Sequence, residues 1–105
     1  MNNEDQEVVE EVSVKKDQPT LFVGTKPIMA YVTSAIIQLS DNHRLFVKAR
    51  GNSIGRAVDV SQIIVRKMSN AGYKITDIKV GSEELNSNDN RLRHGSFISL
   101  EITKG

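Results

Sequence analysis

The fold is decided by residues 44–60, RLFVKARGNSIGRAVDV, where the spacing of apolar residues changes within one short stretch. Up to residue 50 apolar and polar residues alternate, which is typical of a strand with two different faces. The two faces are Leu45, Val47 and Ala49 on one side and Arg44, Phe46, Lys48 and Arg50 on the other. Gly51 then breaks the strand, and Asn52 or Ser53 can cap a following helix. That helix is predicted to run to about Ser69, with an apolar stripe of Ile54, Ala57, Val58, Ser61, Ile64, Val65 and Met68.

The preceding segment repeats this strand, turn and helix order. Leu21–Gly24 reads as a short strand, and Pro27 suits the first turn of a helix that extends to about Leu39. Its apolar stripe is Ile28, Val32, Ala35, Ile36 and Leu39, and further apolar residues lie outside the stripe at Met29, Tyr31 and Ile37. A helix that is apolar on most of its circumference needs two partners. We therefore expect a homodimer, with a turn at residues 40–42 ending the helix.

The segment after the second helix predicts two strands joined by a polar loop. Tyr73–Leu85 is the third strand, with Ile78 and Val80 expected in the core, and residues 86–95 form the loop. Ser96–Thr103 is the last strand, with Ile98, Leu100 and Ile102 pointing inward. The order is β-α-β-α-β-β, and right-handed crossovers put both helices on one face of a mixed four-stranded sheet. The predicted fold class is therefore an α/β two-layer sandwich.

Length and composition limit the class of protein. A chain of 105 residues predicts one domain. It has no cysteine, which excludes a disulfide framework, cysteine-based zinc sites and cysteine catalysis, and which suits a reducing cytoplasm. No apolar run reaches the ~18 residues that a membrane span needs, and the polar acidic start is unlike a signal peptide.

The charge is divided unevenly along the chain. Residues 1–18 hold six acidic residues and two lysines, whereas residues 19–105 hold twelve lysines and arginines and seven acidic residues. The first segment is predicted to be a disordered acidic tail and the second a single basic domain, with net charges of −4 and +5. A basic body with an acidic tail is typical of proteins that bind polyanions, although a solvated surface would show the same charges.

The sequence gives little support for catalysis. His43 and His94 lie in predicted turns without a helical partner four residues away, and the serines lack a G-x-S-x-G context. Asp59 fits a structural hydrogen bond better than acid catalysis. The stretch ARGNSIGRAV matches neither a dinucleotide fingerprint nor a P-loop, although it exposes amides at a helix start where a phosphate could sit. We expect no enzyme, no metal and no cofactor.

Basic residues are predicted to converge at one edge of the sheet. The loops that leave two parallel strands meet at the same edge, so Thr25 and Lys26 should lie near residues 50–53. The hairpin tip adds Arg91, Arg93 and His94, and a twofold axis would give a basic floor with two arms suited to a duplex. The three phenylalanines, Phe22, Phe46 and Phe97, are isolated strand residues that we expect in the core or in an interface. No stacking platform is predicted, which disfavours a binder of single strands.

Four stretches resemble the Alba family of archaeal chromatin proteins. They are VGTKPIMAYV at 23–32, FVKARGNSIGRAVDV at 46–60, DIKVGSEEL at 77–85 and ISLEITK at 98–104. The resemblance covers roughly residues 20–104 and leaves the tail outside. It implies a dimer of β-α-β-α-β-β subunits that coats double-stranded DNA with little sequence preference, and family members also bind RNA.

The resemblance also implies which residues bind. Lys48, Arg50 and Arg56 match the family's basic strand end and helix start, and Asn52 stands where many members have another basic residue. The binding set implied by the resemblance and the arm is Thr25, Lys26, Lys48, Arg50, Asn52, Arg56, Arg91, Arg93 and His94. Many members carry a phenylalanine for contacts between dimers where this chain has Met68. The family usually has two adjacent lysines after the first strand, the first of which is the proposed acetylation site. Thr25 replaces it here, so Lys26 is the remaining candidate for acetylation.

The sequence is compatible with three functions. The first is a non-enzymatic chromatin protein in the cytoplasm that coats and compacts or protects the chromosome, as a homodimer or as a heterodimer with a paralogue. The second is an RNA-binding protein of RNA metabolism, since phosphate contacts suit both kinds of duplex. The third is a dimeric protein-interaction scaffold whose basic loops only confer solubility.

Overall fold

The computed structural model describes residues 19–86 and 92–105. The elements are β2 (Thr20–Phe22), α2 (Ile28–Asn42), β3 (Arg44–Arg50), α3 (Ile54–Lys67), β4 (Tyr73–Asn86) and β5 (Leu92–Lys104). Two short 3₁₀ turns, η1 (Gly51–Ser53) and η2 (Ser69–Ala71), flank α3. The predicted acidic tail at residues 1–18 and Arg91 lie outside the described residues.

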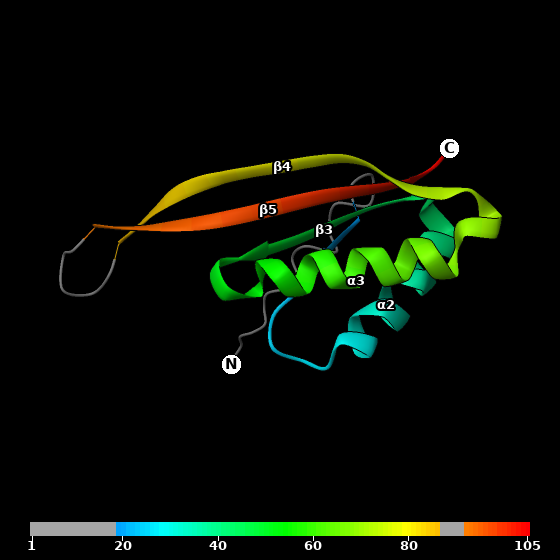
Figure 1. Ribbon diagram of the computed structural model, residues 1–105, viewed down its shortest axis with the longest axis horizontal. Coiled ribbons are helices and arrows are strands. Elements are labelled where there is room, and N and C mark those ends of the chain that lie inside the picture. Colours follow the sequence, from blue (N-terminus) through cyan, green and yellow to red (C-terminus); the bar gives the residue numbers. More distant parts are fainter. Residues whose placement is uncertain (1–18, 87–91) are drawn as a thin grey trace.

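The four strands form one mixed sheet with the order β2-β3-β5-β4. Strand β2 pairs with β3 in parallel, and β5 pairs with β3 and with β4 in the antiparallel direction. Both helices lie against the same face of this sheet (Figure 1). The predicted two-layer α/β sandwich is therefore confirmed.

The core lies between the helices and the inner face of the sheet. The side chains of Leu45, Val47 and Ala49 from β3 are buried, as the alternation in that strand predicts. Ile98, Leu100 and Ile102 from β5 are also buried and meet Leu39 and Ile64 from the two helices. Each large side chain buried in this way contributes about 1.5–3 kcal/mol, which is how alternating apolar residues hold the layers together.

Helix α2 is longer than the sequence indicates, and the turn predicted at residues 40–42 is wrong. The hydroxyl of Ser40 donates to the Ile36 carbonyl at 2.9 Å, and the Asn42 amide donates to the Gln38 carbonyl at 2.9 Å. These side-chain bonds let polar residues continue the helix on its exposed side. The helix ends at His43, whose φ of 61° lies in the left-handed region.

The two hairpin strands are also longer than predicted. Strand β4 ends at Asn86 and β5 begins at Leu92, and both residues lie in the segment that the sequence predicted to be a loop. Arg50, the last residue of β3, pairs with Phe97 of β5. The residues of β5 before Phe97 are paired with β4 beyond the end of β3. They form an arm that projects from the edge of the sheet where β3 ends (Figure 1).

Ile78 and Val80 are not in the core, so that prediction is wrong for this chain. They pair with Leu100 and Ile98 and therefore face the helix side of the sheet. Their exposed fractions are nevertheless 56% and 72%, because the helices leave this face of the outermost strand β4 uncovered. The alternation correctly indicated the face of these residues but could not indicate whether a helix covers it.

Helix α2 carries apolar surface outside its core stripe, as the sequence indicates. Met29 and Ile37 are 49% and 63% exposed.

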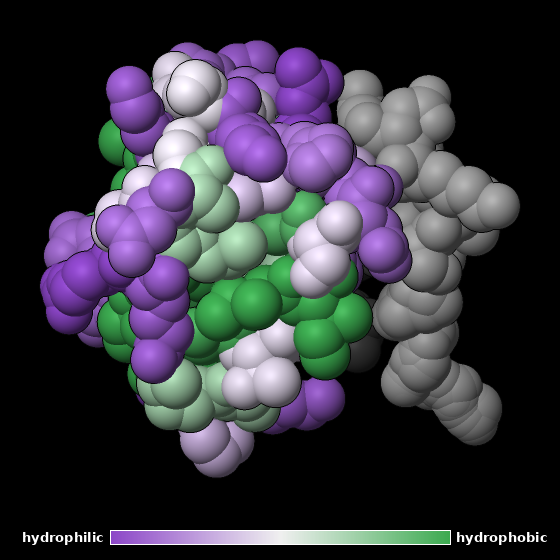
Figure 2. Space-filling model, turned by 90° about the vertical axis from the view of Figure 1, so that its right-hand side faces the viewer, coloured by the Kyte–Doolittle hydropathy of each residue, from purple (hydrophilic) through white to green (hydrophobic). Residues whose placement is uncertain are grey.

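Figure 2 views the end of the molecule where α3 ends and β4 begins, and it shows hydrophobic residues gathered between polar ones. No helix in the described part of the chain is long and apolar enough to cross a membrane.

Candidate nucleic-acid interface

The turn between β2 and α2 is held in place by one tyrosine. The Tyr31 hydroxyl accepts a hydrogen bond from the Gly24 N–H at 2.8 Å and another from the Lys26 N–H at 3.1 Å. Tyr31 is only 8% exposed, and its position in the first turns of α2 lets its ring reach back under the chain. The turn therefore has a defined shape, while the side chain of Lys26 is exposed to solvent.

Arg56 ties the same turn to the start of α3. Its Nε–H donates to the Gly24 carbonyl at 2.8 Å, and its Nη2 donates to the Lys26 carbonyl. The two loops that leave β2 and β3 are thus joined, which confirms the prediction that they meet at one sheet edge. Two donor groups of Arg56 are bonded to backbone carbonyls, so we infer that Arg56 positions Lys26. Its remaining donor groups can still contact a phosphate.

The turn after β3 brings the next two predicted residues to this edge. Gly51 has a φ of 54°, a conformation that glycine adopts without the cost borne by other residues. Asn52 follows it in η1 and is exposed, as is Thr25 in the neighbouring turn. Ser53 occupies the N-cap position of α3 but makes no capping hydrogen bond with its side chain. Thr25, Lys26, Asn52 and Arg56 therefore belong to one group, which we call the turn group.

Arg50 is the last residue of β3, next to the turn group, and its side chain lies on the outer face of the sheet, which is the face without helices. Its side chain is 71% exposed, and its Nε lies 2.7 Å from Oε2 of Glu83 on β4. The distance is that of an ion pair, but this oxygen accepts no aligned hydrogen bond from the described residues. The two groups therefore attract each other by charge without an aligned hydrogen bond. An exposed ion pair of this kind adds little to stability.

Lys48 is separated from the turn group, because it lies on the outer face two residues before the end of β3. Its Nζ is 5.9 Å from the centre of the Phe46 ring, a cation–π distance. The predicted binding residues therefore form a turn group and an outer-face pair, Lys48 and Arg50.

The outer arm of the predicted site is described only in part. Arg93 and His94 are in β5, where their backbones pair with Leu85 and Glu84. This pairing places them in the projecting arm, while their side chains and the whole of Arg91 lie outside the described residues. Met68, predicted at a contact between dimers, is the C-terminal cap of α3 and packs partly buried against the core.

None of the three phenylalanines belongs to the buried core, so of the two places expected for them only an interface remains as a prediction. Phe22 is 53% exposed, and the strand registers put Phe22, Phe46 and Phe97 on the outer face. A helix on both faces would have buried them, but the two helices lie together on the other face.

Two further residues at the site were missed on the sequence. Tyr31 could have been found only from its spacing, since it follows Pro27 by about one helical turn. Glu83 gives no local signal, because it meets Arg50 through the pairing of β5 with two strands.

The fold and the site define a small α/β protein with a clamped lysine turn and a projecting hairpin at one sheet edge. Comparison with known proteins gives the family: the sequence model of the family named Alba matches residues 19–82. A curated relative, the DNA/RNA-binding protein Alba of Nitrosopumilus maritimus (strain SCM1), is 58% identical over 85 residues, which are 81% of this chain and 90% of the relative. The chain belongs to the Alba family.

Solved structures agree with this assignment. Alba from Thermoplasma volcanium matches with a TM-score of 0.71 and 32% identity, covering 80% of this chain and 98% of that one. ALBA1 from Trypanosoma brucei matches with a TM-score of 0.61 and 19% identity, covering 82% of this chain and 68% of that one. The second likeness shows the fold alone.

Proposed function

We propose that this protein is a non-enzymatic, sequence-general nucleic-acid-binding protein that coats double-stranded DNA and compacts or protects the chromosome in the cytoplasm. The observation that carries the proposal is the turn at residues 24–26, which Tyr31 and Arg56 hold from two helices so that Lys26 faces solvent. A lysine whose only role is solubility needs no such support. The name of the curated relative, which refers to both DNA and RNA, supports the same class of ligand.

Binding comes mainly from contacts between cations and phosphates. The turn group and Arg50 supply the floor, and Arg91, Arg93 and His94 supply the arm. Such contacts release counterions, so log affinity falls with log salt by about 0.9 for each phosphate that is neutralised. Acetylation of Lys26 would remove one of these charges and weaken binding.

The protein acts as a homodimer, and we place its interface on the uncovered face of β4, in place of the α2 surface from which the sequence led us to expect a dimer. Ile78 and Val80 are largely exposed there, and a groove between α3 and β4 is lined by Val65, Tyr73 and Ile75 among other residues. A second copy that packs the same surface against this one would cover both sets of residues by twofold symmetry. A paralogue with the same face would form a heterodimer in the same way, and Met68 remains our proposed contact between dimers.

RNA is the second proposed ligand, since a floor and arm that contact phosphates fit either duplex geometry. The deciding experiment is a competition titration at two salt concentrations, with random duplex DNA against structured RNA of equal length. Tight duplex binding that falls with salt, with RNA the weaker competitor, supports the chromatin role. RNA that competes equally or better places the protein in RNA metabolism.

The double variant Lys26→Ala/Arg50→Ala separates either binding function from a protein-interaction scaffold. We expect weaker binding and a salt slope reduced by about one for each cation that contacts a phosphate. The matched control is Lys67→Ala/Lys104→Ala, which removes two exposed lysines away from the turn group and so has the same net charge. Equal affinities of the two double variants would contradict the proposed site, and absence of binding at low salt would leave the scaffold.

A further inference from the structure

The outer face of the sheet carries all the phenylalanines of the chain. Phe22 comes from β2, Phe46 from β3 and Phe97 from β5, which are consecutive neighbours in the sheet. Neither helix covers this face (Figure 1). Burying a phenylalanine would contribute about 1.5–3 kcal/mol, so a sheet face that leaves these rings accessible forgoes a substantial stabilisation.

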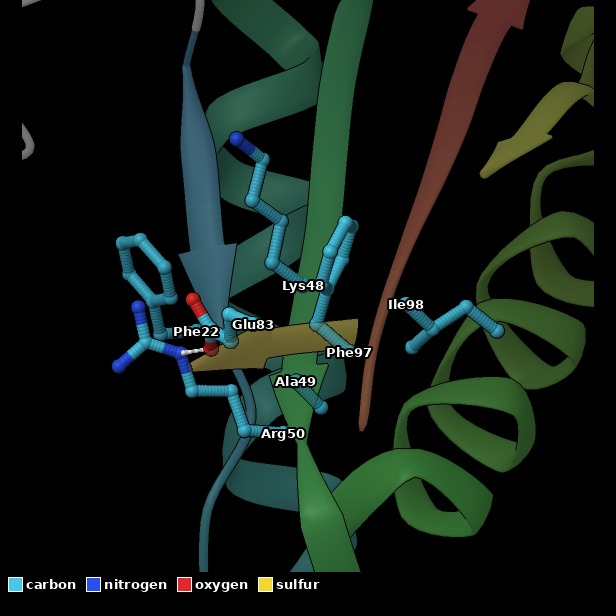
Figure 3. A pocket seen from close by; sticks show the side chains of 7 residues that line it. All are labelled: Phe22, Lys48, Ala49, Arg50, Glu83, Phe97 and Ile98. Atoms are coloured by element: carbon cyan, nitrogen blue, oxygen red, sulfur yellow. Dashed lines mark ion pairs between the residues drawn. The ribbon is translucent and has the colours of Figure 1, made fainter. Parts of the chain in front are cut away.

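The rings of Phe22 and Phe97 line a hollow of about 250 Å³ on this face. The other lining residues are Lys48, Ala49, Arg50, Glu83 and Ile98, and we call this site the phenylalanine hollow. In Figure 3, Ile98 points away toward α3, whereas the charged side chains lie with Phe22 on the outer side. The hollow is smaller than the ~300–1,000 Å³ pockets that enclose drug-sized molecules, and it suits one planar ring system.

The position of Phe97 depends on a missing side chain at Gly81. The two residues are paired across β4 and β5, and a Cβ atom at Gly81 would lie 2.8 Å from the edge of the Phe97 ring. The ring therefore lies over the Gly81 backbone, in space that the side chain of any other residue at position 81 would fill. This arrangement fixes one wall of the hollow before a ligand binds.

The charges around the hollow fit a nucleotide. Lys48 and Arg50 are at its rim and can contact phosphates on either side of a bound base. Glu83 Oε2 is buried and accepts no hydrogen bond from the described residues, although Arg50 balances its charge. The other oxygen of the Glu83 carboxylate lies on the side away from Arg50 (Figure 3), and it can accept a hydrogen bond from the amino group of a base.

We propose that the phenylalanine hollow binds an unpaired nucleobase of single-stranded RNA or DNA by stacking on Phe22 and Phe97, with flanking phosphates on Lys48 and Arg50. A duplex cannot use this site, because its bases are already stacked on one another. Stacking on exposed aromatic rings is the usual way in which proteins hold single strands. The inference rests on the proposed function only in taking the ligand to be nucleic acid.

The first test uses the fact that the chain has no tryptophan. The variant Phe22→Trp puts a single indole in the hollow, and its fluorescence reports stacking directly. We expect quenching by single-stranded oligonucleotides and none by a duplex of the same sequence. The control is Ile37→Trp, on the helix layer at a site 63% exposed, where neither ligand should quench. Ribo- and deoxyribo-oligonucleotides of one sequence then show which strand is preferred.

The second test measures affinity in unlabelled protein. Phe22→Ala should weaken single-strand binding about tenfold, within the range for loss of one stacked base. Phe22→Tyr should restore it, Ile37→Ala should leave it unchanged, and duplex affinity should stay within twofold throughout. Because Phe22 is 53% exposed, the alanine variant should fold, which circular dichroism checks.

The outcomes separate this inference from the proposed function. Quenching by single strands together with a selective loss in Phe22→Ala supports the phenylalanine hollow as the site. Duplex binding with no effect of Phe22→Ala on single strands overturns the inference alone. A change in Phe22→Trp fluorescence on protein dilution, without nucleic acid, would mean that a second copy occupies the hollow and would also overturn it. Absence of binding to any nucleic acid overturns both proposals.

Discussion

At the scale of single residues, Lys26 depends on atoms that do not themselves meet a ligand. Its N–H group bonds to the Tyr31 hydroxyl, and its carbonyl accepts from Arg56. The backbone of Lys26 is therefore held by a tyrosine from α2 and an arginine from α3. The sequence indicated Lys26 and Arg56 as binding residues, but it could not show that one supports the other.

Removing the Tyr31 hydroxyl should loosen this turn. In Tyr31→Phe the N–H groups of Gly24 and Lys26 lose their acceptor, at a cost of about 1–3 kcal/mol in the free energy of unfolding. Because Lys26 is then less well positioned, duplex affinity should fall severalfold at constant salt. Urea unfolding and a titration with duplex DNA measure the two effects.

Tyr73→Phe is the matched control, since it makes the same chemical change at the only other tyrosine. The Tyr73 hydroxyl donates to the Leu39 carbonyl at 3.0 Å, far from the turn in the sequence. This variant should lose comparable stability and keep its duplex affinity. Equal loss of affinity in both variants would show that general destabilisation, and not the turn, is responsible.

At the scale of elements, the sequence predicted those that depend on local pattern. The bounds of β3 agree with the alternation of residues 44–50, and the core faces of β3 and β5 follow from it. The end of α2 was missed because Ser40 and Asn42 bond back to the helix and His43 takes a left-handed conformation. Those features depend on side-chain geometry that residue type alone does not determine.

The outer-face residues show a second limit of the sequence. The alternation put Phe46 with Lys48 and Arg50 on one face, but it did not relate that face to Phe22 and Phe97 on other strands. Strand order does so, because β5 lies between β3 and β4 although it is last in the chain. The phenylalanine hollow and the Arg50–Glu83 pair therefore depend on the order of the strands in the sheet, which cannot be predicted from the residue pattern of any single strand.

A pair of glycine variants tests whether the missing side chain at Gly81 shapes the hollow. Gly55→Ala in α3 adds a methyl group with nothing within 4 Å, so it should stabilise the protein by about 0.5–1 kcal/mol through helix propensity. Gly81→Ala has the same intrinsic gain but forces the Phe97 ring to move from its place 2.8 Å away, so its net effect on stability should be near zero. Thermal unfolding measures both, and only Gly81→Ala should weaken single-strand binding. A loss of single-strand affinity in Gly55→Ala as well would contradict this assignment.

At the scale of the whole molecule, the uncovered face of β4 is the best test of the dimer. Val80→Asp puts a charge on a face that we propose is buried between subunits, and an unpaired buried charge is strongly disfavoured. The protein should become a monomer, as measured by sedimentation equilibrium over a range of concentrations. The control Lys79→Asp changes the neighbouring exposed residue, which faces the other side of the sheet, and should leave the dimer intact. If Val80→Asp remains dimeric, the subunits meet elsewhere.

The division of charge along the chain leads to the last prediction. The segment of residues 1–18 has a net charge of −4 and the rest of the chain +5, so the tail can compete with phosphates for the basic edge. A full-length variant with the six acidic residues of the tail changed to their amides removes this competitor and keeps the chain length. Its duplex affinity should exceed that of the unchanged protein at low salt.

The difference should disappear as salt rises, because both the attraction of the tail and the attraction of the duplex are screened within about 10 Å at 0.1 M salt. The titration is therefore done at low and at high salt with both proteins. An affinity gain that persists at high salt would point to a cause other than charge competition. Equal affinities at low salt would show that the tail does not reach the basic edge, and the turn group would then be free to bind in every chain.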